Sequence, residues 1–219
     1  MFITRKACTQ MTNQSYNQSK TLIKKTQTRH LGNSLAVLFC IGMFAASSAW
    51  ATVINWNLNP NGTGGAVGST SQTFVSSGYS ITAYGYTVGN PNTTLGLYFK
   101  NDGSDEVGLG VVDTPHHELQ TFDGMPLQFI QLDLSSLLNQ GFTDGKIEVG
   151  SVQSGESFAL YGSNALGVLG TQIGTYDSSS DLAFVDVPNF GQFDYISIGA
   201  LTFDVLPVAF QATNSGARA

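Results

Sequence analysis

From residue 53 onward, the chain consists of short segments in which apolar and polar residues alternate. Segment 79–87 places Ile81 and Ala83 on one face of an extended chain, and in segment 129–134 every second residue is Ile or Leu. A period of two is typical of a β-strand that buries one of its faces. This patterning constrains the fold more than any other feature, because each such strand needs a second layer to cover its apolar face.

Gly, Asn, Asp and Ser separate these segments and favour turns. We expect strands over residues 53–58, 72–75, 79–87, 95–100, 129–134, 146–152, 157–162, 166–176, 182–187, 195–200 and 201–210. The sequence thus predicts an all-β fold, a single-domain antiparallel β-sandwich of jelly-roll-like form. One short helical turn is expected near 135–140, started by Asp133 or Ser135 and ended by Gly141.

The first 51 residues have the pattern of an export signal. They contain six basic and no acidic residues, an apolar run over 35–46, and the small-x-small sequence Ala49-Trp50-Ala51. We therefore expect a signal peptide over 1–51, a β-sandwich domain over 52–210 and a disordered tail over 211–219. The expected location is secreted or cell-surface, and translation starts at either Met1 or Met11. The apolar run is too short for a membrane span of about 20 residues.

Removal of this segment changes the charge and the cysteine content of the chain. Residues 52–219 keep three basic and fifteen acidic residues, which gives a net charge of −12, and they contain no cysteine. Such a surface repels nucleic acid and anionic lipid, so we expect no nucleic-acid partner and no stable membrane anchor in the mature chain. A disulfide therefore cannot form in residues 52–219, and any cross-link that stabilises this domain must be of another kind.

Residues 100–119 concentrate the charge of the mature chain, and Lys100 is the only base near five carboxylates. We predict that these carboxylates hold a structural calcium ion, which prefers six to eight hard oxygen ligands: Asp102, Asp105, Glu106, Asp113 and Glu118. The spacing is not that of an EF-hand, since Val107 stands where that loop needs Gly. We expect Gly108-Leu109-Gly110 to form a tight turn. The alternative is a solvated acidic loop that hydrogen-bonds its own backbone.

The same stretch contains residue types found in two kinds of catalytic site. His116, His117 and Glu118 lack the H-E-x-x-H spacing of zinc proteases, and adjacent residues on a strand would point to opposite faces. A glycosidase would use two of Glu106, Asp113 and Glu118 as acid and base, at a separation that sequence does not give. We expect no catalytic residue and no enzymatic activity, with a glycoside hydrolase as the lesser alternative.

Aromatic residues offer a third kind of site. Tyr84, Tyr86 and Tyr98 fall on the strand faces opposite Ile81 and Leu97. Exposed there, they could stack on sugar rings and make the protein a carbohydrate-binding module with a polysaccharide partner. The alternative is ordinary cross-strand packing.

Several motifs resemble those of a known family. They are Asp-Glu-x-Gly-Leu-Gly at 105–110, Asp113, His-Glu-Leu at 117–119, Phe-Ile-Gln-Leu-Asp-Leu-Ser at 129–135 and Gly-Ser-Val-Gln-Ser-Gly-Glu-Ser-Phe-Ala-Leu-Tyr-Gly-Ser at 150–163. Together, over 79–205, the chain resembles small secreted bacterial β-sandwich proteins of the PEP-CTERM type. The resemblance implies export, sorting by exosortase and a place in the exopolysaccharide or biofilm matrix. The Pro-Glu-Pro sorting tail is missing here, so we expect release rather than retention.

These observations favour an exported, non-enzymatic extracellular or cell-surface protein, associated with the matrix, whose acidic loop binds a structural cation. A carbohydrate-binding module and a glycoside hydrolase are the alternatives.

Overall fold

The computed structural model describes residues 51–60, 62, 64–89, 91–103 and 106–215. The expected signal peptide, apart from Ala51, lies outside the described residues, as does Asp105.

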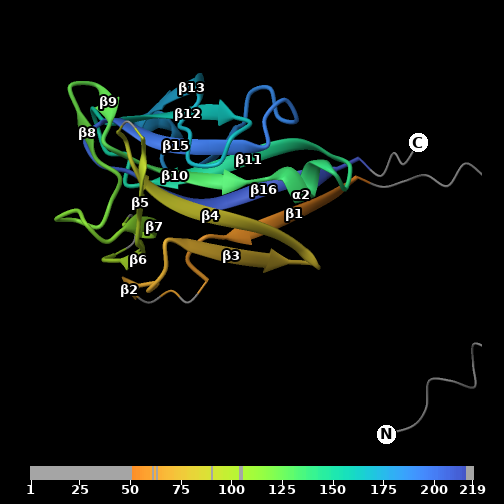
Figure 1. Cartoon of the computed structure of the whole chain (residues 1–219), viewed down its shortest axis with the longest axis horizontal. Helices are drawn as coiled ribbons and strands as arrows, with labels where there is room; N and C mark the ends of the chain where they lie inside the picture. Colours follow the sequence, from red (N-terminus) through yellow and green to blue (C-terminus); the bar gives the residue numbers. More distant parts are fainter. Residues whose placement is uncertain (1–50, 61, 63, 90, 104–105, 216–219) are drawn as a thin grey trace, which may run out of the picture. The chain divides into compact units, whose positions relative to one another are not determined.

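Two antiparallel sheets form the body of the fold (Figure 1). The four-stranded sheet has the order β1 (Thr52–Asn57), β16 (Leu206–Asn214), β11 (Phe142–Gly150) and β14 (Ala183–Asp186). The seven-stranded sheet runs β13 (Thr171–Asp177), β12 (Ser157–Ser163), β15 (Tyr195–Thr202), β10 (Gln128–Asp133), β4 (Tyr79–Thr87) and β3 (Ser71–Ser76), with β5 (Thr93–Leu95) also paired to β4. The predicted single-domain β-sandwich is therefore confirmed.

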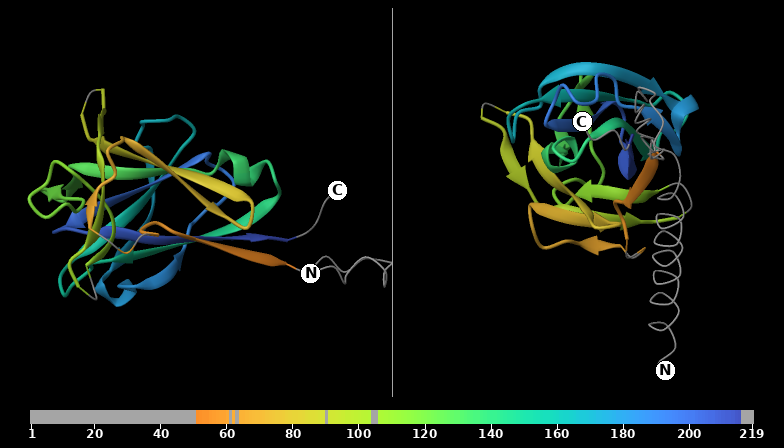
Figure 2. Two further views of the ribbon diagram at one scale, coloured as in Figure 1. Left: turned by 90° about the horizontal axis from the view of Figure 1, so that it is seen from below. Right: turned by 90° about the vertical axis from the view of Figure 1, so that its right-hand side faces the viewer.

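The core lies between these two sheets, whose strands Figure 2 shows in two further views. Alternate residues of each strand point into it, and Ile81, Ala83, Ile130, Leu132, Ile196 and Ile198 of the large sheet are all at most 1% exposed. Trp56 of β1 lies 5.8 Å from Phe210 and donates its indole N–H to the carbonyl of Tyr79 at 3.2 Å. Its buried polar atom is thereby satisfied.

Two smaller sheets extend the sandwich at one end. One has the order β2 (Gly65–Ala66), β6 (Leu97–Asn101) and β7 (Val107–Val111), and the other is the hairpin of β8 (Thr121–Phe122) and β9 (Met125–Pro126). The prediction of a tight turn at 108–110 is wrong, because these residues lie within β7. A Cβ on Gly108 would lie 2.7 Å from the carbonyl oxygen of Pro207, so the missing side chain lets β7 approach β16 closely.

Other local predictions have mixed outcomes. Strand 79–87 and the helical turn are confirmed, the latter as α2 (Ser135–Leu138), with a second short helix at η1 (Ser178–Ser180). Asp133 accepts a hydrogen bond from the backbone of Ser135, and Gly141 has the left-handed φ of +82°. Residues 166–170 are not a strand, and the tail expected from 211 is wrong for 211–214, which continue β16.

Candidate functional site

The site is built around Lys100, near the end of β6. Alternation along β6 turns Leu97 and Phe99 into the core, and Lys100 is itself only 3% exposed. Its backbone carbonyl accepts a hydrogen bond of 2.7 Å from the side chain of Asn59, which is also buried. A lysine is rarely this buried unless its ammonium is paired, so the burial of Lys100 depends on its partners.

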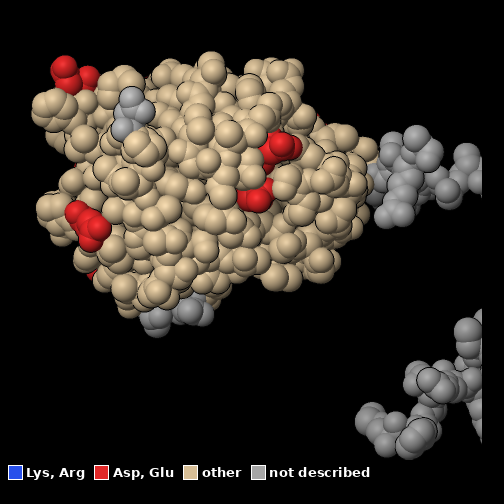
Figure 3. Space-filling model, viewed as in Figure 1, with Lys and Arg blue, Asp and Glu red and all other residues tan. Residues whose placement is uncertain are grey.

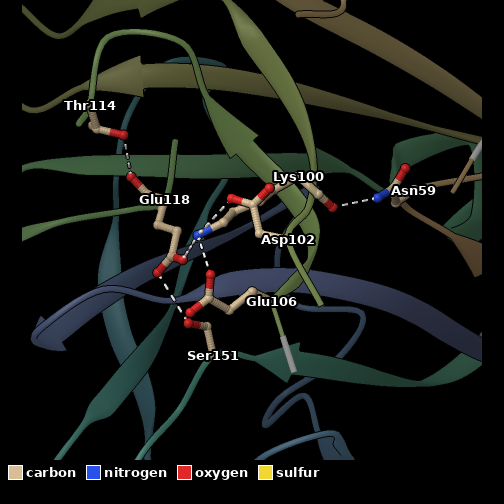
Figure 4. Close-up of polar contacts among 7 residues, drawn as sticks. All are labelled: Asn59, Lys100, Asp102, Glu106, Thr114, Glu118 and Ser151. Atoms are coloured by element: carbon tan, nitrogen blue, oxygen red, sulfur yellow. Dashed lines mark hydrogen bonds and ion pairs between the residues drawn. The ribbon is translucent and has the colours of Figure 1, made fainter. Parts of the chain in front are cut away.

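Three carboxylates surround the ammonium of Lys100 (Figure 4). Glu118 Oε1 is in direct contact with Nζ, Glu106 Oε2 lies 2.8 Å away, and Asp102 Oδ2 lies 3.7 Å away. Their burial differs sharply, since the side chain of Glu118 is 5% exposed, that of Glu106 37% and that of Asp102 66%. Glu118 is therefore the principal partner of the lysine, and Asp102 contributes little through solvent.

The second oxygen of Glu118 is also engaged. Ser151, in the segment that follows β11, donates its hydroxyl hydrogen to Oε2 at 3.1 Å. The backbone carbonyl of Glu118 accepts from the hydroxyl of Thr114 at 3.0 Å. Three segments that are distant in sequence thus meet at one carboxylate, and each of its oxygens has a partner.

In this cluster, burial and ion pairing shift the pKa values of Lys100 and Glu118 in opposite directions. Burial alone would lower the pKa of Lys100, but the hydrogen bonds to Glu106 and Glu118 raise it above its ordinary value. Burial raises the pKa of Glu118, and the hydrogen bond and charge of Lys100 oppose this rise. Burial also raises the pKa of Glu156, as do the charges of Glu118 and Asp204.

The turn over residues 113–118 presents Glu118 to the lysine. Within it, His117 adopts a left-handed φ of +58°, and its ring stacks on Tyr98 at a centroid distance of 3.8 Å and an angle of 16°. A Cβ on Gly110 would lie 1.7 Å from the carbonyl oxygen of His117, so the turn rests directly on the backbone of β7. After the turn, Leu119 pairs with Val205 as an isolated bridge.

His116 and His117 have different surroundings, as expected. The expected reason, that they are adjacent residues of a strand, is wrong. They belong to a turn rather than to a strand. His117 lies on Tyr98, whereas His116 lines the pocket beside Lys100.

The structure brings together three of the five predicted calcium ligands: Asp102, Glu106 and Glu118. Asp113 is exposed and makes no ion pair with Lys100, while Asp105 lies outside the described residues. Among the described residues, no group of three or more His, Cys, Asp or Glu side chains has an arrangement that could hold a metal ion. Calcium binding stays a prediction, and an ammonium occupies the centre where the cation was expected.

The three candidate tyrosines do not form one exposed platform. Tyr86 is 5% exposed and stacks on Phe129 at 5.1 Å, so the expectation that it is open to a sugar ring is wrong. Tyr98 is half-buried beneath His117, and Tyr84 is half-buried on β4.

A pocket of about 210 Å³ opens beside the lysine. It is lined by Lys100, Glu106, His116, Glu118, Ser151, Gln153, Glu156, Phe203 and Asp204. Phe203 is 65% exposed and has a left-handed φ of +57°, a strained conformation for a bulky residue. The sequence did not predict the pocket wall formed by residues 151–156 and 203–204, because these two loops are brought together by the pairing of β12 with β15 and of β11 with β16, strands that are distant in sequence.

On the face shown in Figure 3, the acidic side chains of the described residues form small separate patches, and no described Lys or Arg is visible. Charge therefore gathers around Lys100 more clearly than on this outer face.

Comparison of the chain with protein-family models, with curated proteins and with solved structures finds no match. Within the part of the chain that the structure describes, no helix is long and apolar enough to cross a membrane.

Proposed function

We propose that this protein is an exported, non-enzymatic component of the cell surface or extracellular matrix. Export rests on the signal pattern of residues 1–51, and a place in the matrix rests on the resemblance to PEP-CTERM-type proteins. The structural role rests on the site itself.

One observation carries the structural role. Glu118 is the carboxylate buried beside the pocket, and both its oxygens are already held, by Lys100 and by Ser151. A general acid or base must exchange a proton with a bound substrate, which requires an oxygen free to reach it. The arrangement instead resembles a clamp that joins β6, the turn over 113–118 and the segment after β11.

Two experiments test this function. The N-terminus of protein recovered from the medium or the cell surface should be Thr52, and protein retained in the cytoplasm with residues 1–51 intact would contradict export. Incubation with a broad panel of glycans should release no reducing sugar. Release that Glu118→Gln abolishes would establish a glycoside hydrolase instead.

A second candidate function is carbohydrate binding at the pocket beside Lys100. Phe203 favours it, because an aromatic ring that is 65% exposed stands at the edge of a pocket with several polar side chains. Sugar sites commonly combine apolar contact with a few oriented polar groups. The site would then differ from the tyrosine faces expected from sequence.

Retention on immobilised polysaccharides tests this candidate. Phe203→Ala should weaken retention, whereas Phe122→Ala should not, since Phe122 is similarly exposed at 72% but belongs to the β8–β9 hairpin and is not one of the residues that line the pocket. Equal retention of the two variants and the wild type would remove this pocket from consideration.

A further inference from the structure

The contact between Lys100 and Glu118 places an amine against a carboxyl group inside the fold. Both side chains are at least nine-tenths buried, at 4% and 5% exposed. They come from positions 18 residues apart, in β6 and in the turn before Leu119. A third group, Glu106, lies 2.8 Å from the same nitrogen.

We propose that Lys100 and Glu118 condense to an intramolecular amide, an isopeptide bond between Nζ and Cδ. The residues present are those that the reaction needs: a nucleophilic nitrogen, an acyl carbon and a carboxylate that can carry a proton between them. The bond would be a covalent staple in a mature chain that has no cysteine.

The reaction balances without any co-reactant. Glu106 takes one proton from the ammonium, and the free amine attacks Cδ of Glu118. In the tetrahedral intermediate, the nitrogen gives up a second proton, and Glu106 returns the first. One carboxyl oxygen of Glu118 leaves with both protons as water, and the nitrogen keeps one proton in the amide. The positive and negative charges of the original pair disappear together.

Positioning favours this condensation. Burial alone would favour the neutral amine, but the hydrogen bonds to Glu106 and Glu118 raise the pKa of Lys100, so a carboxylate must remove the proton before the amine reacts, which is the role of Glu106. The fold holds the groups in contact, which replaces an encounter in solution by a reaction of high effective concentration. Ser151 donates a hydrogen bond to Oε2 and can stabilise the negative charge that develops on this oxygen during attack.

Comparison with Lys146, the other lysine among the described residues, shows which features are specific to the pair of Lys100 and Glu118. Lys146 lies 2.8 Å from Asp186, but the two side chains are 44% and 81% exposed. Water solvates both charges there, and among the described residues no second carboxylate forms an ion pair with that ammonium. Lys146 is therefore a matched internal control.

Tryptic digestion of the denatured full chain followed by mass spectrometry tests the proposal. Lys100 and Lys146 are the only trypsin sites between residues 52 and 146. The expected result is cleavage after Lys146 but not after Lys100, and a peptide ending at Lys146 whose mass is lower than the sequence requires by one water molecule. Cleavage after both lysines, with the full sequence mass, would overturn the proposal.

Variants locate the bond and the role of Glu106. Lys146→Arg should retain the loss of one water, whereas Lys100→Arg should regain the full mass. Glu106→Gln should also regain it, or lose water far more slowly after folding. If Lys100→Arg still lacked the mass of one water molecule, the assignment of the bond to Lys100 would be wrong. If Glu106→Gln lost water at the wild-type rate, Glu106 would not be the group that transfers the proton. The wild-type measurement stays decisive even where a variant fails to fold.

Discussion

Gly110→Ala should destabilise the fold, because the turn that carries Glu118 rests on the backbone of β7 at this residue. The new Cβ would lie 1.7 Å from the carbonyl oxygen of His117 and 2.8 Å from its carbonyl carbon. Ordinary contact begins at 3.4 Å, so the turn would have to retreat by about 1.7 Å. No rotamer change can relieve this contact, since both atoms belong to the backbone or are fixed to it.

The magnitude follows from overpacking. Inserting a methyl group into a filled site costs about 1–3 kcal/mol and occasionally more. The reduced entropy of the unfolded chain returns at most about 1 kcal/mol. We expect a net loss of about 2 kcal/mol or more, which lowers the melting temperature by about 4–8 °C in a domain of this size.

Equilibrium unfolding in urea measures this loss. Gly64→Ala is the control, because its Cβ would have no neighbour nearer than 3.7 Å, and its unfolding free energy should stay within about 0.5 kcal/mol of the wild type. If Gly110→Ala were as stable as Gly64→Ala, the close backbone contact between the turn over 113–118 and β7 would be wrong.

Two further predictions concern charge. Burial raises the pKa of Glu148 above its unfolded value, so protonation of this carboxylate stabilises the fold at low pH, and the contribution is lost as the pH rises through the folded-state pKa. Glu148→Gln should therefore raise the melting temperature at pH 7 and leave it nearly unchanged at about pH 4. An equal rise at both pH values would contradict the raised pKa. Because the nitrogen of Lys100 already occupies the point on which Glu106 and Glu118 converge, millimolar calcium or a chelator should leave the melting temperature unchanged. A rise in the melting temperature with calcium would instead support the predicted metal site.

The sandwich could be predicted from sequence because its signal is local. Segment 79–87 alternates strictly, and β4 has those bounds. Segment 166–170 misled the prediction because Leu166 and Val168 alternate like strand residues. They belong to a loop whose backbone is held by Gln131, which accepts from the amide of Gly167 at 2.7 Å and donates to the carbonyl of Val168 at 2.8 Å.

The site could be predicted only in part. The excess of carboxylates near a single base was visible in residues 100–119, and from it we predicted a bound calcium ion, which stays a prediction. That Lys100 lies buried at the centre of these carboxylates could not be seen, because lysines are usually exposed. Ser151 and Phe203 reach the site only through pairing of distant strands, for which the sequence has no local signal.

The central claim is that Lys100 and Glu118 act as one structural unit that secures the acidic stretch. A double-mutant cycle of Lys100→Met and Glu118→Leu tests it most directly. Each single variant leaves a buried charge without its principal partner and should cost about 3–5 kcal/mol of unfolding free energy. The double variant should cost no more than either single one, which gives a coupling above about 2 kcal/mol. Costs that add to within about 0.5 kcal/mol would show that the two residues act independently and would contradict the claim.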